Sequence, residues 1–306
     1  MDTRERFRGA LLGLACGDAV GTAVEFRARD SFEPLTDMVG GGPFGLDPGQ
    51  WTDDTSMALC LATSLVECGE FNPRDQMDRY WRWAREGYLS STGTCFDIGN
   101  TVGDALSRYQ RTGEPYAGSS DPYAAGNGSI MRLAPVALAY YPDIERVEEL
   151  AAESSRTTHG ATECVDACRL MGRMLCRALD GASLDQVLLA GADGFVATPK
   201  IAAIARGDYR DKTEDDIRGT GYVVASLEAA LWCLCQTSSY REAILLAANL
   251  GDDADTTAAV CGQLAGAHYG CTESAGGIPT RWLERLTMAD EITWLADQLL
   301  DLEISP

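Results

Sequence analysis

The sequence GALLGLACGDAVGTAVEF (residues 9–26) contains four glycines and four alanines among its apolar residues. Small residues let a helix approach its neighbours closely. The segment is also the only candidate for a membrane span, but it carries Asp18 and Glu25, and charged residues are rare in spanning helices. We therefore predict a tightly packed internal helix here, within a helical region over residues 3–20.

The chain has 306 residues, of which 45% are hydrophobic, a proportion that is normal for a globular protein. Its net charge is −21, from 46 acidic and 25 basic residues. Because that field repels nucleic acids and anionic membranes, we do not expect partners of either kind. The polar start MDTRERFR is followed only by the charged run described above, which does not resemble a signal peptide. We expect a soluble, cytoplasmic monomer.

Eleven cysteines would suggest disulfides in a short secreted chain. Here no CxxC pair occurs, and two histidines are too few to supply a thiolate–imidazole zinc site. The cysteines instead stand in apolar helical runs, which favours buried, reduced thiols in a cytosolic protein. Those in such runs are Cys60, Cys164, Cys168, Cys176, Cys233, Cys235 and Cys261.

Nearly every apolar segment has the period of an α-helix, and convincing alternating strands are absent. The sequence therefore predicts an all-α fold. The helices are expected at 3–20, 54–68, 73–86, 98–111, 128–140, 145–155, 161–180, 183–192, 221–236, 240–248, 255–269 and 290–302.

The loops between these helices are long and rich in Gly and Pro, but none has the length or low complexity of a domain linker. No repeat of 20–50 residues is visible. We therefore predict one compact helical domain over residues 1–306, with its long loops gathered into a site. These loops are 33–51, 112–127, 193–200, 207–220 and 270–280.

Two acidic clusters stand at predicted helix starts. The first is GQWTDDT (49–55) and the second is GDDADTT (251–257). Either one alone is explained by helix capping, since Asp and Thr are preferred at N-caps and favour the positive end of the helix dipole.

Taken together, the clusters offer four carboxylates (Asp53, Asp54, Asp253 and Asp255) and threonine hydroxyls. An all-oxygen set suits hard cations such as Mg²⁺, Mn²⁺ or Ca²⁺. Four carboxylates would also balance two divalent ions, and without metal they would raise one another's pKa values. The sequence predicts a two-metal site, on condition that the chain brings the two clusters together.

Six segments, in a fixed order along residues 9 to about 270, resemble one family. The chain is similar to the ADP-ribosylglycohydrolases, and especially to their dinitrogenase reductase-activating branch. The matching segments are GALLGLACGDAVGTAVEF (9–26), WTDDTSMAL (51–59), FDIGNT (96–101), GNGSIMRLAPVAL (126–138), THG (158–160) and GDDADTTAAVCGQLAGAHYG (251–270).

The resemblance implies an all-α domain with a dinuclear Mg²⁺ or Mn²⁺ centre. Asp252 departs from the branch, which often has glycine there, and we interpret it as a surface carboxylate or one that lies behind the ligands. The metal ligands that the resemblance implies are Thr52, Asp53, Asp54, Asp253, Asp255 and Thr256.

Two further acidic residues match the family near the metals. Glu25 is an ordinary exposed acid on one interpretation, and by resemblance it positions water or acts as a general base. Asp97 is an N-cap on one interpretation, and by resemblance it faces the scissile bond and holds a guanidinium leaving group or an oxocarbenium-like sugar. Asn100 is expected one turn further on, toward the same face. The expected catalytic residues are Glu25, Asp97 and Asp54.

The remaining substrate contacts are implied in the same way. Gly126, Asn127, Gly128 and Ser129 precede an apolar helix, where free N–H groups would cradle a diphosphate. A plain turn and cap is the alternative interpretation of this segment. His159 is either structural or a phosphate or ribose contact, and Tyr222 either packs in the core or stacks on the adenosine part.

The predicted function is metal-dependent hydrolysis of the N-glycosidic bond between ADP-ribose and arginine, which would release ADP-ribose from a modified protein or small molecule. The first alternative is the same chemistry on serine, O-acetyl-ADP-ribose or a nucleobase. A second is a silent ADP-ribose-binding or structural relative. A third is a metal phosphohydrolase, although the chain lacks the HD histidine pairs and the paired ExxE helices that such enzymes use. Whether loop 33–50 closes over the site is left open.

Overall fold

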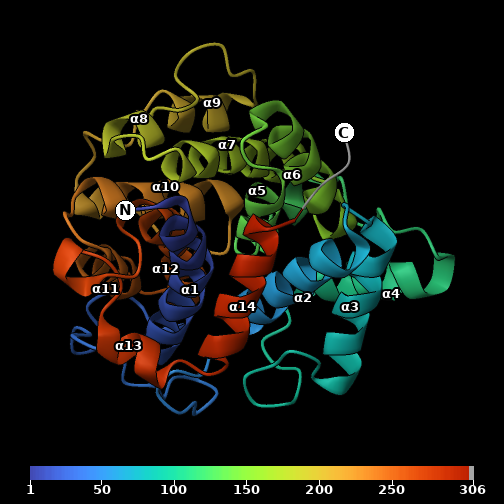
Figure 1. Cartoon of the computed structure of the whole chain (residues 1–306), viewed down its shortest axis with the longest axis horizontal. Helices are drawn as coiled ribbons and strands as arrows, with labels where there is room; N and C mark the ends of the chain where they lie inside the picture. The colour runs from blue at the N-terminus through green and yellow to red at the C-terminus, as the bar shows by residue number, and fades with distance from the viewer. Residues whose placement is uncertain (303–306) are drawn as a thin grey trace.

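The computed structural model describes residues 1–302 and is built from helices (Figure 1). No strand occurs in this part of the chain, where extended pairing is limited to three isolated bridges. The predicted all-α fold is therefore confirmed. The α-helices are α1 (Thr3–Gly21), α2 (Asp53–Cys68), α3 (Pro73–Glu86), α4 (Asn100–Thr112), α5 (Ala134–Tyr140), α6 (Ile144–Thr158), α7 (Thr162–Leu179), α8 (Leu184–Leu188), α9 (Pro199–Ala205), α10 (Val223–Cys235), α11 (Tyr240–Asn249), α12 (Ala254–Tyr269), α13 (Thr280–Arg285) and α14 (Ala289–Leu300). Short 3₁₀ turns are η1 (Thr22–Val24), η2 (Pro122–Ala124), η3 (Glu214–Asp216) and η4 (Glu273–Ala275).

Helices α1 and α12 lie against each other at the centre of the fold (Figure 1). The side chain of Asp2 accepts a hydrogen bond from the Glu5 N–H and so caps the start of α1. Every residue from Gly9 to Gly21 is buried, as is every residue from Ala254 to Ala267. Because both helices are covered on all sides, they form the core around which the other helices are arranged.

Small residues on every fourth position let the two helix backbones touch. A Cβ atom added at Gly13 would lie 2.4 Å from the carbonyl oxygen of Gly262, and one at Gly17 would lie 2.3 Å from that of Ala258. No side chain therefore fits between the helices at these positions, and the pairing fixes their antiparallel register. The facing pairs are Gly9 with Gly266, Gly13 with Gly262, Gly17 with Ala258, and Gly21 with Ala254.

The same helix explains the apolar N-terminal segment. Over Thr3–Val24 its mean hydropathy reaches 1.2, which would suit a membrane span by length and composition alone. However, 89% of the apolar window is buried inside the fold. The prediction of an internal packed helix is confirmed.

Several predicted boundaries were wrong. The apolar segment expected as a helix over 128–140 forms turns until Leu133, and α5 begins only at Ala134. The helix expected over 183–192 ends at Leu188. Two short helices, α9 and α13, begin at the ends of segments that were expected to be loops, and each starts at or directly after a proline.

All eleven cysteines lie within the described residues, and none is paired in a disulfide. Of the seven that were expected to be buried, six are, and Cys235 is half-buried. Cys16, within α1, is also buried. The buried thiols therefore act as small core residues, as their apolar surroundings predict, whereas Cys68 is exposed.

Candidate functional site

A cavity of about 450 Å³ lies where the N-termini of α2 and α12 meet the segment that follows α1. Helix N-termini carry partial positive charge, which favours carboxylates in their first turns. Residues from both acidic clusters line this cavity, together with residues from FDIGNT (96–101) and from the glycine loop that begins at Gly126. Its acidic lining residues are Glu25, Asp53, Asp97 and Asp253.

The two acidic clusters, about 200 residues apart in sequence, touch each other. The hydroxyl of Thr256 donates to Asp54 Oδ2 at 3.2 Å, and Thr52 Oγ1 lies 3.3 Å from Asp255 Oδ2. All four residues are at most 5% exposed. The condition on which the predicted cation site depended is therefore met.

Asp18, in the last turn of α1, holds the start of α2 in place. Its carboxylate accepts hydrogen bonds from the backbone N–H groups and the hydroxyls of both Thr52 and Thr55. Burial nevertheless raises the pKa of Asp18 to about 6, although these hydrogen bonds act in the opposite direction. Asp18 thus orients Thr52 from behind the cavity.

Glu25 is attached to the second cluster through the backbone. The N–H of Phe26 donates to the carbonyl of Asp252, and the N–H of Asp252 donates to the carbonyl of Arg27, both at 2.7 Å. Asp252 has a φ of 57°, and Gly251 before it has a φ of 71°. This tight turn directs the backbone of Asp252 toward Phe26 and leaves its side chain half-exposed, and the two hydrogen bonds tie the segment of Glu25 to the start of α12.

Asp97 does not cap a helix. Helix α4 begins at Asn100 with Gly99 as its N-cap, and Asp97 stands earlier in the loop, with a φ of 57°. A non-glycine residue in this left-handed conformation is uncommon and is often found at functional sites. Asn100 lines the same cavity as Asp97, as its spacing predicts.

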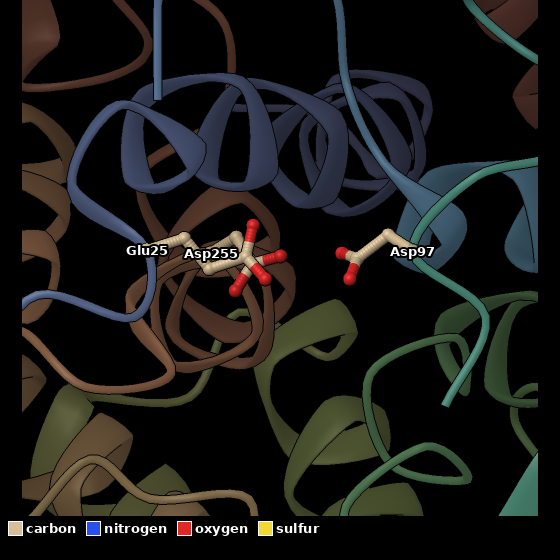
Figure 2. Close-up of side chains that lie close together, drawn as sticks. All are labelled: Glu25, Asp97 and Asp255. Atoms are coloured by element: carbon tan, nitrogen blue, oxygen red, sulfur yellow. The ribbon is translucent and has the colours of Figure 1, made fainter. Parts of the chain in front are cut away.

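Three carboxyl groups converge from different segments. Figure 2 shows Glu25 and Asp255 side by side, with Asp97 pointing toward them from the opposite wall. One carboxylate oxygen from each lies within 4.8 Å of the others. Glu25, at 3% exposure, is buried, which rules out its interpretation as an ordinary exposed acid.

The proximity of these carboxyls raises their pKa values. Burial, followed by the charges of Asp97 and Asp253, raises the pKa of Glu25 to about 9. Burial, followed by the charge of Asp18, raises the pKa of Asp97 to about 7. Like charges in a poorly hydrated space oppose each other's ionisation. Burial is also the largest cause that raises the pKa values of Asp53, Asp54, Asp253 and Asp255.

The site contains acceptor atoms that the protein leaves unpaired. Glu25 Oε2, Asp54 Oδ1 and Asp255 Oδ1 are buried and have no hydrogen-bond partner among the described residues. A buried carboxylate oxygen without a donor is costly unless a cation approaches it. The atoms that could bind a metal ion here are all oxygens, so the cluster can bind a hard cation.

The glycine loop at Gly126–Gly128 forms another wall of the cavity. The side chain of Asn127 donates to Asp253 Oδ2 at 2.6 Å and so links this loop to the second acidic cluster. The N–H groups of Gly126 and Asn127 are already bonded, to Ala124 and Gly221. Contrary to expectation, no helix begins directly behind the loop, because α5 starts only at Ala134. The N–H groups of Gly128 and Ser129 form no hydrogen bond with the described residues, so they are the donors that the loop can offer to a ligand.

Two of the predicted substrate contacts lie behind the glycine loop. The hydroxyl of Ser129 points into the core, where it accepts from Ser155 and Cys168. The His159 ring packs beneath the loop, and a Cβ added at Gly128 would lie 2.8 Å from ring atom Cε1. A side chain at Gly128 would therefore displace the histidine.

A second, larger cavity of about 820 Å³ adjoins the first, and both are lined by Thr101, Gly126 and Gly221. Tyr222 stands in the larger one, at the N-cap of α10. Its hydroxyl accepts from Lys200 Nζ at 2.6 Å and donates to Glu163. Tyr222 is therefore a cavity residue rather than a core residue, and it lines the larger cavity and not the one that holds the acidic cluster.

Asp18 was not predicted as a residue of the site. The available signal was a charged residue inside a helix of glycine and alanine, because a fully buried carboxylate must have donors around it. Arg132 was also not assigned, although it stands within the apolar run that follows the glycine loop.

Comparisons with known proteins agree with this geometry. The model of a protein family described as ADP-ribosylglycohydrolase matches residues 1–306. A protein of Pseudomonas putida (strain GB-1) named "ADP-ribosylarginine hydrolase Tri1" is 46% identical over 97% of this chain and 78% of its own length. The "ADP-ribosyl-[dinitrogen reductase] glycohydrolase" of Rhodospirillum rubrum is 33% identical over 97% of this chain and 96% of its own.

Among solved structures, a chain described as "ADP-ribosylglycohydrolase-related protein complex" superposes with a TM-score of 0.87. It is 43% identical to this chain, with 98% of this chain and 99% of the other covered. The likeness therefore includes both the fold and the segments that form the two cavities.

Proposed function

The chain belongs to the ADP-ribosylglycohydrolase family, and from this we propose that it hydrolyses the N-glycosidic bond between ADP-ribose and an arginine side chain. The observation that carries the proposal is the convergence of Glu25, Asp97 and Asp255 beside unpaired buried oxygens. The choice of arginine is supported by the names of the relatives, two of which are called ADP-ribosylarginine hydrolases at 46% and 43% identity. The substrate is then an ADP-ribosylated protein or small molecule, and the products are ADP-ribose and the same molecule with an unmodified guanidine group.

We assign two divalent ions, Mg²⁺ or Mn²⁺, to the acidic cluster. The carboxylates of Asp53, Asp54, Asp253 and Asp255 would neutralise the charge of two such ions. The unpaired buried oxygens of Asp54 and Asp255 support the assignment. When bound, such ions polarise sugar oxygens and lower the pKa of water. The proposed ligands are Thr52, Asp53, Asp54, Asp253, Asp255 and Thr256.

Glu25 and Asp97 flank the space where the scissile bond would lie, on opposite walls of the cavity (Figure 2). In its ionised form one of them accepts a proton from the attacking water as the water oxygen bonds to the anomeric carbon. The carbon–nitrogen bond breaks, and the guanidine leaves with the bonding electron pair. The Asp97 carboxylate also suits the guanidinium group, to which it can accept charge-assisted hydrogen bonds.

The rest of the substrate follows the two cavities. The N–H groups of Gly128 and Ser129 lie near the diphosphate in this arrangement, and Asn100 faces the reacting ribose. The larger cavity, with Tyr222 in its wall, has the volume for a nucleoside. Because one family model spans residues 1–306, we also propose that the chain forms a single domain.

The test is incubation of the protein with ADP-ribosyl-arginine in the presence of Mg²⁺ or Mn²⁺. We expect release of ADP-ribose, and we expect Asp54→Ala to abolish it. No release with either ion would overturn the arginine assignment. A parallel panel of ADP-ribosyl-serine, O-acetyl-ADP-ribose and an ADP-ribosylated base would then identify the linkage, and ADP-ribose binding without turnover on any substrate would indicate a silent relative.

A further inference from the structure

We propose that Arg132 and Thr158 are positioning residues that hold the neutral His159 ring as its Nε2–H tautomer, so that the ring can donate a hydrogen bond to a phosphate at the glycine loop. The proposal rests on the proposed function insofar as the phosphate is that of ADP-ribose. It concerns binding and not bond cleavage.

The first observation is a chain of hydrogen bonds behind the loop. Arg132 Nη2 donates to the hydroxyl of Thr158 at 2.7 Å, and that hydroxyl lies 2.8 Å from His159 Nδ1. Arg132 Nη1 also donates to the carbonyl of Gly128 at 2.8 Å. All three side chains are at most 2% exposed, so water does not provide alternative partners.

The direction of each hydrogen bond follows from the donor inventory. A guanidinium can only donate, so the oxygen of Thr158 must accept from Arg132. The single hydrogen of this hydroxyl then has one acceptor in reach, His159 Nδ1. If Nδ1 carried the proton instead, the buried hydroxyl hydrogen would have no acceptor, which is unfavourable. Nδ1 is therefore the acceptor, and the ring proton stands on Nε2.

Electrostatics favour the same neutral form. Burial, and next the charge of Arg132, lower the pKa of His159 to about 3. Among the described residues, no carboxylate forms an ion pair with Arg132, whose guanidinium instead lies 4.7 Å from the centre of the Tyr80 ring. A buried cation without a carboxylate partner behind the loop favours an anion in front of it.

The ring nitrogen faces the glycines. A Cβ atom at Gly126 would lie 3.3 Å from Nε2 and one at Gly128 would lie 3.2 Å from it. Within residues 1–302, Nε2 has no hydrogen-bond partner, so the N–H that it carries faces the two glycines of the loop and lacks an acceptor there. A phosphate held there by backbone N–H groups would accept this additional hydrogen bond.

The decisive experiment measures the ring and the ligand separately. In the wild-type protein we expect nitrogen-15 NMR to show the Nε2–H form of His159. Only His159 and His268 contribute imidazole signals, and His268→Gln assigns them. In Thr158→Val the hydroxyl is lost, and we expect a tautomer mixture together with roughly tenfold weaker ADP-ribose binding by calorimetry with Mg²⁺. Binding of adenosine, which has no phosphate, should stay unchanged.

The controls separate positioning from loss of structure. Thr158→Ser keeps the hydroxyl and should restore both the tautomer and the affinity. Thr63→Val removes another buried hydroxyl, one that bonds only to Leu59 within α2, and should leave both unchanged. The proposal is overturned by the Nδ1–H form in the wild type, or by full ADP-ribose affinity in a folded Thr158→Val. Neither result depends on whether arginine is the linkage that the protein cleaves.

Discussion

The carboxylate of Asp18 accepts both the backbone N–H and the hydroxyl of Thr52, each at 2.9 Å from its Oδ1. Asp18 stands on α1, and Thr52 is the N-cap of α2. The central helix thus fixes the direction of a proposed metal ligand that stands on another element. Residues that orient ligands in this way usually affect metal affinity although they do not touch the ion.

Asp18→Asn should weaken metal binding. The amide replaces one acceptor oxygen with an NH₂ group that faces the donors of Thr52 and Thr55, so both threonines lose part of their support. We expect the Kd for Mn²⁺ to rise by about 10- to 100-fold, as measured by calorimetry. An unchanged Kd in the folded variant would contradict the positioning role of Asp18.

The stability of the metal-free protein should fall as pH rises. Burial and neighbouring charges raise the pKa of Asp97 to about 7 and that of Glu25 to about 9, whereas both groups ionise near pH 4 in the unfolded chain. Between about pH 4 and these raised pKa values the folded state therefore holds more protons than the unfolded chain. For each extra proton held, the free energy of unfolding falls by about 1.4 kcal/mol for every unit by which the pH rises. Thermal melting in the presence of a chelator, from about pH 5 to about pH 8, measures this slope.

Divalent ions should remove this dependence, because they neutralise the carboxylates in place of protons. We expect the gain in Tm on addition of Mn²⁺ to be larger near pH 8 than near pH 6. An equal gain at both pH values would show that the ions bind away from these carboxyls.

Asp54→Asn should separate stability from activity. Asp54 Oδ1 is buried without a partner, and its charge adds to the repulsion in the cluster. Without metal we expect the variant to be more stable than the wild type by about 1 kcal/mol. Turnover of ADP-ribosyl-arginine should fall at least about 100-fold, because a proposed metal ligand is lost. A variant that is less stable than the wild type in chelator would contradict the repulsion argument.

Gly13→Ala should destabilise the fold strongly. Its Cβ would lie 2.4 Å from the carbonyl oxygen of Gly262, so α1 and α12 would have to separate. We expect a loss of about 3 kcal/mol in the free energy of unfolding, measured by denaturant titration. The matched control is Gly103→Ala in α4, where the added atom meets nothing within 4 Å. That change should stabilise by about 0.5–1 kcal/mol, since glycine is unfavourable in a helix interior.

Periodicity was sufficient to predict the helices that position the site. The predicted 54–68, 73–86 and 255–269 agree with α2, α3 and α12 to within one residue. Each of these helices begins at a clear capping or proline signal. The apolar run after the glycine loop was misleading, because Gly128 to Leu133 form turns whose apolar side chains are buried without helical order.

The site itself was only partly predictable. The two acidic clusters could be found from residue type, but their meeting depends on the register between α1 and α12, which no local pattern states. The left-handed conformation of Asp97 and its place three residues before α4 contradict its interpretation as a helix cap. The hydrogen-bond chain from Arg132 to His159 joins two segments that are 26 residues apart, and therefore could not be derived from spacing.

The glycine contacts between α1 and α12 have a consequence for which changes in chain length the protein can accept. A residue inserted between Gly9 and Gly21 would turn the following part of the helix by about 100° and shift it by about 1.5 Å. The glycines beyond it would no longer face α12, and Glu25, at the end of this segment, would leave its place beside Asp255. Homologues should therefore vary freely in the lengths of their surface loops, while this helix keeps a constant number of residues. Its length fixes the position of Glu25 relative to Asp255.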